Sequence, residues 1–223
     1  MNLSPAKLLR GLIALCLIVA WAMLAHYGSV GEGNPNLGAA LATAPIVAIA
    51  VIILWRFSSP LWVALGGFCA LAMVAASWPY LRDNIAALYF VQHVGTNLAL
   101  GTFFGTTLLG ERQALITQFA LLAHNGVISS EKTRYTRQLT FVWSLFFFLT
   151  ASLSVILFFW FPPVAWSIFA NILPIPLILL MFGIEHLVRH RVLPPADRSS
   201  IADTIRGYQA GRQNATASLS KRP

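Results

Sequence analysis

Charged residues are scarce in this chain. Only 10% of its 223 residues are Asp, Glu, Lys or Arg, whereas a soluble domain usually has about 25%. Hydrophobic residues make up 57% of the chain. This balance argues against a soluble enzyme or binding domain. It indicates an integral membrane protein with little mass outside the lipid bilayer, which is its first expected partner.

Cysteines and catalytic motifs are equally sparse. The two cysteines, Cys16 and Cys69, form no CxxC pair and have no histidines at metal-ligand spacing, so we expect both to pack as buried apolar side chains. GxSxG, HExxH, a P-loop and a GxGxxG followed by the right elements are all missing. We therefore assign no catalytic residue, metal or cofactor, and we favour a protein that is not an enzyme.

Long apolar stretches dominate what is present. A helix needs about 20 mostly apolar residues to cross the bilayer, and spanning strands would alternate and last only about 10. The chain therefore predicts an all-α, polytopic membrane helix bundle. The six predicted spans are Leu8 to Tyr27, Gly38 to Trp55, Leu61 to Trp78, Ala87 to Leu109, Thr140 to Phe161 and Val164 to Val188.

The basic residues indicate an orientation. If the N-terminus lies in the cytoplasm, every Lys and Arg except Arg82 falls on the cytoplasmic side of the six spans. An odd number of spans would destroy this partition, so we expect both termini inside the cell. Retention of basic residues inside also explains the net charge of +8. No nucleic acid is expected as a partner, because the only basic soluble part is a short tail.

Two segments are expected outside the hydrocarbon. Residues 114–123 place Leu115, Ile116, Phe119 and Leu122 on one helical face, which predicts a short amphipathic interfacial helix between spans four and five. Asn125-Gly126 ends it, and Ser130 is the predicted N-cap of the helix that follows. Residues 1–194 then form the membrane domain. Residues 195–223 form a cytoplasmic, largely disordered basic tail.

The fourth span carries polar and small residues on one face. Tyr89, His93, Asn97, Gly101 and Gly105 recur every four residues. Gly101 and Gly105 form a GxxxG pattern, which predicts close approach of another helix.

Prolines 174 and 176 predict a bend in the sixth span. The depth of Asn171 in that span predicts that it approaches His93 or Asn97. These three residues are the candidate polar intramembrane site. The alternative is a packing seam, with the Asn171 amide capping carbonyl groups that the prolines release.

A basic cluster accompanies the only acidic residue within a span. Glu185 has Arg189 one helical turn later, and Arg134 and Arg137 are predicted at the same membrane level. A structural ion pair of Glu185 is expected. The alternative is a docking or anion-binding surface in which Arg134, Arg137, Glu185, Arg189 and Arg191 take part.

The second half of the chain resembles a family of small, uncharacterised bacterial inner-membrane proteins. The resemblance covers roughly Trp78 to Pro194. It rests on Tyr89-Phe-Val-Gln-His93 with Thr96-Asn97, Arg134-Tyr-Thr-Arg137 with Thr140 and Trp143, Trp166-Ser-Ile-Phe-Ala-Asn171, and Glu185-His-Leu-Val-Arg-His-Arg-Val-Leu-Pro194. Members are often encoded among fatty-acid-synthase-like genes, some of which make aryl polyene or xanthomonadin-type pigments. The resemblance implies a context but no catalytic residue.

Three functions follow as hypotheses. The first is a non-enzymatic accessory or scaffold that docks acyl carrier protein or biosynthetic enzymes of acyl-chain or polyene lipid synthesis at the cytoplasmic face, through basic residues. The second is a carrier or flippase for a lipid-like product. The third is an intramembrane acyl-transferring enzyme that uses His93. The sequence gives no oligomeric state.

Overall fold

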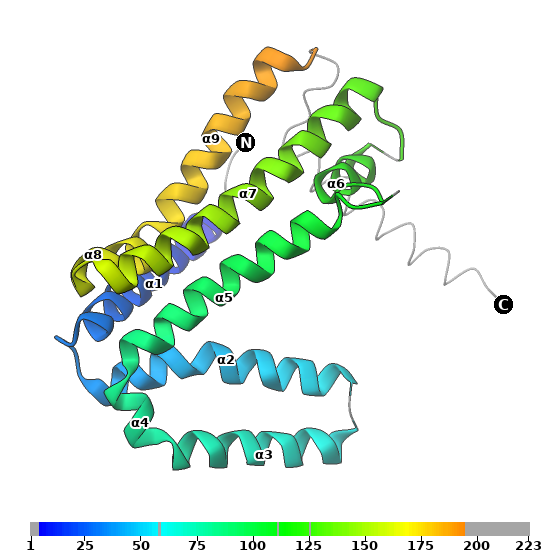
Figure 1. The fold of residues 1–223 in the computed structure, drawn as a ribbon. Helices are drawn as coiled ribbons and strands as arrows, with labels where there is room; N and C mark the ends of the chain where they lie inside the picture. Colours follow the sequence, from blue (N-terminus) through cyan, green and yellow to red (C-terminus); the bar gives the residue numbers. More distant parts are fainter. Residues whose placement is uncertain (1–4, 58, 111, 125, 195–223) are drawn as a thin grey trace. The chain divides into compact units, whose positions relative to one another are not determined.

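The computed structural model describes residues 5–57, 59–110, 112–124 and 126–194, and these residues form helices joined by short turns, with no strand among them (Figure 1). Proline opens five of these helices, where its missing N–H costs no hydrogen bond. The helices are α1 (Pro5–Val30), α2 (Pro35–Phe57), α3 (Pro60–Ala76), α4 (Trp78–Asp83), α5 (Ile85–Thr106), α6 (Leu115–Ala123), α7 (Ser130–Trp160), α8 (Pro163–Ser167), the π-helix η1 (Ile168–Ile172) and α9 (Pro174–Val192).

Several of these helices have the length and composition of membrane spans. Leu9–Val30, Pro35–Arg56 and Ser130–Trp160 are each long and apolar enough to cross a bilayer. The segments Pro163–Ile172 and Pro174–Val192 qualify together as a fourth, bent span. The described part of the chain is thus all-helical, with the long apolar helices of a membrane protein. The predicted number of six spans remains a prediction.

The chain forms two compact units. Unit 1 contains residues 1–94 and 153–176, and unit 2 contains residues 95–152 and 177–223. The chain passes from one unit to the other within α5, within α7 and near the start of α9. Residues 195–223, for which a disordered tail is expected, lie outside the described residues.

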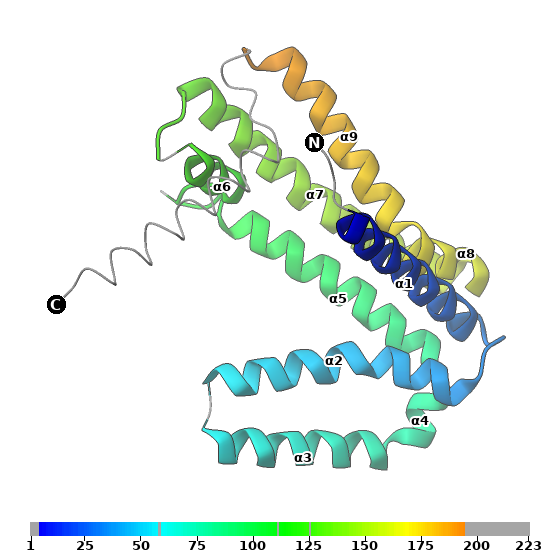
Figure 2. The same ribbon diagram turned by 180° about the vertical axis from the view of Figure 1, so that it is seen from behind.

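Small residues bring the helices of unit 1 together. Its core contains Ala25 of α1, Ala39 and Ala42 of α2, and Trp166 of α8, which is only 1% exposed. Alanine leaves room for close helix contacts, and the large indole fills the remaining space. As a result α1 packs against α2, α8 and η1, and its position beside α8 is visible in Figure 2.

The helix pair α2–α3 presents much apolar surface. The two helices run antiparallel and contact each other (Figure 1), yet no residue of α3 is buried. The expectation that the two cysteines are buried is wrong, because Cys16 and Cys69 are both exposed. Both lie on apolar helices whose outward faces have few protein neighbours, so periodicity alone could not predict their burial.

The predicted proline bend is confirmed. The segments on either side of Leu173 are inclined by 53°, and the turn before the bend is the π-helix η1. Pro174 cannot donate a backbone hydrogen bond, which interrupts the helical ladder at this point. The bend at Leu173 comes two residues after Asn171, whose side chain donates hydrogen bonds to Ser29 and Ser167 within unit 1.

Helix α7 in unit 2 begins one residue earlier than the sequence indicates. The side-chain oxygen of Ser129 accepts a hydrogen bond from the Lys132 N–H at 3.0 Å, so Ser129 is the N-cap and the assignment of Ser130 to that role is wrong. Two adjacent serines made the choice ambiguous. Gly126 ends the connection from α6 with a φ of 87°, a conformation that favours glycine.

Candidate ligand-binding pocket

A pocket of about 520 Å³ lies within unit 2. This is the size of small-molecule sites, which are commonly about 300–1,000 Å³. Its lining comes from α5, α6, α7, α9 and the residue that follows α9. The lining residues are Leu100, Phe104, Ile116, Phe119, Ala120, Lys132, Tyr135, Thr136, Leu139, Trp143, Phe147, Ile178, Phe182, Glu185, Arg189 and Leu193.

The lining changes from polar to apolar along α7. Lys132, Tyr135 and Thr136 line the pocket near the N-terminus of this helix, and Leu139, Trp143 and Phe147 line it further on. These positions recur at helical spacing and so share one face. A rise of about 1.5 Å per residue makes the lined stretch roughly 22 Å long.

The same change occurs along α9 in the opposite chain direction. Arg189 and Glu185 line the pocket toward the C-terminus of the helix, and Phe182 and Ile178 line it toward the N-terminus. Trp143 and Phe182 meet with ring centroids 5.0 Å apart, which joins the apolar parts of both helices. The pocket is therefore amphipathic, with one polar and one apolar end.

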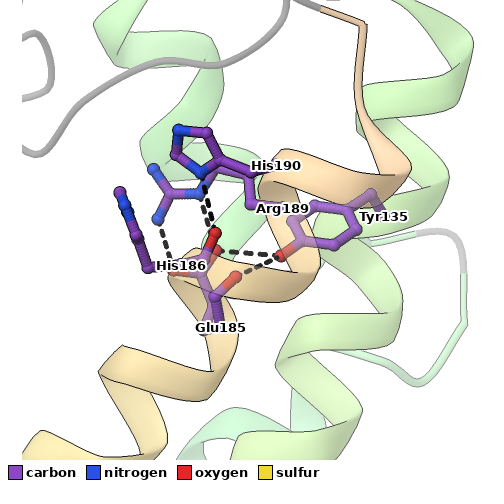
Figure 3. Close-up of polar contacts among 5 residues, drawn as sticks. All are labelled: Tyr135, Glu185, His186, Arg189 and His190. Carbon is purple, nitrogen blue, oxygen red and sulfur yellow. Dashed lines mark hydrogen bonds and ion pairs between the residues drawn. The ribbon is translucent and has the colours of Figure 1, made fainter.

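A buried carboxylate organises the polar end (Figure 3). Glu185 is 5% exposed and accepts hydrogen bonds from the Tyr135 hydroxyl at 2.9 Å and from Arg189 Nε at 2.8 Å. Arg189 Nη2 contacts the second carboxylate oxygen, which completes a two-pronged ion pair within one helical turn. The neighbouring His186 and His190 are exposed, and the His190 ring bonds to the His186 carbonyl oxygen at 2.8 Å (Figure 3).

Lys132 is a second cation of this lining and is only 3% exposed. Its Nζ lies 2.9 Å from Nε2 of His124, whose Nδ1 lies 2.9 Å from the Ala120 carbonyl oxygen. A carbonyl oxygen only accepts, so Nδ1 carries the proton and Nε2 accepts from Lys132.

Helix α6 is fixed to α7 by threonines. The Thr117 and Thr136 hydroxyl oxygens are 2.8 Å apart, and the Ile116 N–H donates to the Thr140 hydroxyl oxygen at 3.2 Å. Thr117 and Thr140 are buried, whereas Phe119 and Leu122 are 49% and 56% exposed. Helix α6 thus packs through a partly polar face and exposes large apolar side chains.

The glycines of the GxxxG pattern lie where α7 approaches α5. A Cβ atom added at Gly101 would lie 3.2 Å from the Phe148 ring, and one added at Gly105 would lie 3.0 Å from the Ser144 hydroxyl oxygen. Larger residues would force the two helices apart here. The close packing supports the wall of the pocket that Leu100 and Phe104 provide.

The residues of the candidate polar intramembrane site have different hydrogen-bond partners. His93 Nδ1 lies 3.0 Å from the Ser154 hydroxyl oxygen in unit 1. The Asn171 amide, also in unit 1, donates to Ser29 and Ser167, each at 3.1 Å. Asn97 is half-buried on the part of α5 that belongs to unit 2. A shared site of these three residues stays a prediction.

Sequence reasoning missed the serine cluster around Asn171. Ser167 is fully buried, and its hydroxyl oxygen lies 2.6 Å from that of Ser29 and 2.8 Å from His26 Nδ1. The spacing of Ser167 and Asn171, one helical turn apart, was the available signal. Nothing local could indicate His26 and Ser29, which lie about 140 positions earlier in the chain.

Sequence reasoning also missed Lys132 and Tyr135 as pocket residues. Their helical spacing with Leu139 and Trp143 was the available signal. The basic residues around this end of unit 2 are exposed where they do not line the pocket. Arg134, Arg137 and Arg191 are exposed, and Arg137 Nη2 donates to the Leu108 carbonyl oxygen at 2.8 Å.

Neither a metal centre nor a known relative provides an interpretation of the pocket. In the part of the chain that the structure describes, no group of three or more His, Cys, Asp and Glu side chains is arranged to hold a metal ion. Comparisons with protein-family models, with curated proteins and with solved structures find no match. The geometry of the pocket is therefore the main evidence for function.

Proposed function

We propose that this protein is a bacterial inner-membrane accessory of acyl-chain or polyene lipid biosynthesis that holds an acyl chain in the pocket of unit 2. The observation that carries the proposal is the amphipathic lining, apolar from Leu139 to Phe147 and polar from Lys132 to Thr136. From Thr136 to Phe147 the helical rise amounts to roughly 16 Å. One lipid chain covers about 15 Å, half of a hydrocarbon core of about 30 Å.

The membrane arrangement that we propose has six spans, with both termini in the cytoplasm and α6 lying in the interface. Three long apolar helices and the bent segments of α8, η1 and α9 account for up to four of these crossings, and the exposed apolar residues of α3 support a further one. The exposed Phe119 and Leu122 of α6 support its interfacial position. The basic residues on α7 and α9 support a cytoplasmic location of the polar end of the pocket.

A second part of the proposal is a docking surface for an acidic acyl carrier protein. Arg134, Arg137 and Arg191 are exposed within unit 2, and two cations of the pocket, Lys132 and Arg189, lie on the same two helices. A carrier protein held by this surface would deliver its acyl chain next to the pocket. Charge reversal at Arg134 and Arg137 should then remove co-purification with the carrier, and unchanged recovery would contradict docking.

Photo-crosslinking tests the pocket itself. Purified full-length protein in lipid nanodiscs is irradiated with a hexadecanoyl probe that carries a diazirine at the far end of its chain. We expect saturable labelling of the apolar lining on α5, α7 or α9. Leu139→Trp should fill the pocket and abolish this labelling. Leu149→Trp, on the exposed side of the same helix, should preserve it. Equal labelling of both variants would refute the proposal.

A further inference from the structure

The apolar end of the pocket in unit 2 is formed by one residue from each of three helices. Leu100 of α5, Phe147 of α7 and Ile178 of α9 are the lining residues of their helices that lie farthest from the polar end. A ligand that enters from the polar end therefore meets these three side chains last.

The close approach of α5 to α7 places Leu100 beside Phe147. A Cβ atom added at Gly101 would lie 3.2 Å from the Phe148 ring. The residues that precede these two in the chain, Leu100 and Phe147, are therefore at nearly the same depth in the pocket. They form one layer of its lining.

Ile178 of α9 belongs to the same layer. Trp143 and Phe182 meet with ring centroids 5.0 Å apart. Phe147 lies one helical turn beyond Trp143, and Ile178 lies one helical turn beyond Phe182, in both cases away from the polar end. The two side chains thus reach the same depth, and three helices together form the apolar end.

The Phe147 ring is held in place by other rings. Its centroid lies 5.6 Å from that of Phe104 and 5.7 Å from that of Trp143, and Phe147 is only 6% exposed. Ala151, one turn farther along α7, is 2% exposed and does not belong to the lining. Because protein covers the face of α7 beyond Phe147, a ligand chain cannot continue past this ring along the helix.

The distance to Phe147 defines a chain length. The helical rise from Thr136 to Phe147 is roughly 16 Å, and the rise from Lys132, where the polar end begins, is roughly 22 Å. Three bonds of an extended chain cover about 3.8 Å. The two distances therefore correspond to about 13 and about 17 bonds.

We infer that Phe147 sets the length of the chain that the pocket accepts, and that the ligand is a single acyl chain of about 14 to 18 carbon atoms. This inference deepens the proposed function and rests on it. A longer chain would have to bend back or displace the Phe147 ring, and overpacking of a well-packed site is unfavourable. A shorter chain would leave Leu100, Phe147 and Ile178 without contacts to the ligand, which forfeits dispersion attraction.

A series of chain lengths on the unaltered protein tests the limit. Full-length protein in nanodiscs is labelled with the diazirine hexadecanoyl probe, and fatty acids of 12, 16 and 20 carbon atoms compete. Competitor concentrations are expressed as mole fractions in the nanodisc lipid, so that the stronger partitioning of longer chains does not bias the comparison. We expect the 16-carbon chain to compete about tenfold better than the 20-carbon chain and several-fold better than the 12-carbon chain.

Three substitutions identify the residue responsible. Phe147→Ala opens the space toward Ala151, one turn or about 5.4 Å farther, which is about four bonds, so the best competitor should become the 20-carbon chain. Ile178→Trp adds a large side chain to the same layer and should favour the 12-carbon chain. Phe141→Ala removes the same kind of ring from a 58% exposed position of α7 outside the lining, and should keep the preference for 16 carbon atoms.

The outcomes separate this inference from the function on which it rests. Saturable pocket labelling in which the 16-carbon chain is not the best competitor would retain acyl-chain binding and overturn the length limit. A preference that Phe147→Ala leaves unchanged would overturn the role of Phe147. If Phe147→Ala does not fold, Phe147→Leu decides, because the smaller side chain should improve the 20-carbon chain relative to the 16-carbon chain. Absence of saturable pocket labelling would overturn both proposals.

Discussion

The Ser144 hydroxyl donates a hydrogen bond to the Gly101 carbonyl oxygen across a distance of 2.8 Å. This bond joins α7 to α5 at the point where Gly101 and Gly105 allow the two helices to approach. Ser144 is 6% exposed, and its hydroxyl oxygen lies 3.0 Å from the position that a Cβ atom of residue 105 would take. The Ser144 side chain is thus held between the two glycines and has little room to move away from an added methyl group.

Gly105→Ala should therefore destabilise the protein. The new methyl group would meet the Ser144 hydroxyl oxygen at 3.0 Å, and we expect a loss of about 1–2 kcal/mol in unfolding free energy. Titration with SDS in mixed micelles measures it. Gly95→Ala is the matched control on the same helix, because no described atom lies within 4 Å of its added Cβ. An equal effect of both substitutions would contradict the close approach at Gly105.

The Tyr135 hydroxyl should stabilise unit 2 through Glu185. Tyr135→Phe removes one donor from a buried carboxylate, and we expect a loss of about 1–3 kcal/mol. Tyr80→Phe is the control, since Tyr80 is 71% exposed. Thermal unfolding in detergent compares the two. The loss should be smaller in a Glu185→Gln background, and full additivity would show that the two side chains act independently.

Ser167 should contribute more to stability than an ordinary serine of a membrane helix. Its hydroxyl oxygen lies within 3.1 Å of polar atoms of His26, Ser29 and Asn171. Interhelical hydrogen bonds in membranes average about 0.6 kcal/mol, so we expect about 1–2 kcal/mol for Ser167→Ala. Ser152→Ala, at an exposed position, should cost much less. Equal unfolding midpoints of both variants would show that the hydrogen bonds of this cluster do not contribute to stability.

The proposed topology predicts which positions share a face of the membrane. The test introduces single cysteines in place of Arg56, Arg137 or Arg191 in a background that lacks Cys16 and Cys69. These cysteines should react with an impermeant maleimide only after the cytoplasmic face is opened. Cysteines at Gly33 and Arg82 should react in intact cells. Reaction of residues 56 and 82 from the same side would exclude α3 as a span and reduce the number of crossings.

Much of the helical architecture could be predicted because its determinants are local. Prolines 35, 60, 163 and 174 start helices, Gly126 ends the turn after α6, and the Pro174 bend is where the sequence indicates. The ion pair of Glu185 with Arg189 follows from helical spacing alone. These features depend on residues within a few positions of each other.

The pocket and the serine cluster could not be predicted because they depend on which helix faces meet. Tyr135 reaches Glu185 and Ser29 reaches Ser167 only after folding brings distant segments together. The burial of Lys132 opposes its usual preference, and its contact with His124, the residue after α6, could not be read from local sequence. Apolar helices of a membrane protein carry little facial pattern, so the sequence did not distinguish exposed from buried faces at Cys16 and Cys69.

The exposure of helix α3 affects how freely its sequence can evolve. None of its side chains is buried, so most substitutions there meet few protein neighbours. Gly66 is an exception, because an added Cβ would lie 2.9 Å from the Leu54 side chain of α2. If α3 crosses the bilayer as proposed, natural selection acts on it mainly through its average affinity for lipid, and at most positions one apolar residue can replace another at little cost. Helix α7, whose side chains line the pocket and form hydrogen bonds with α5, α6 and α9, has no comparable freedom.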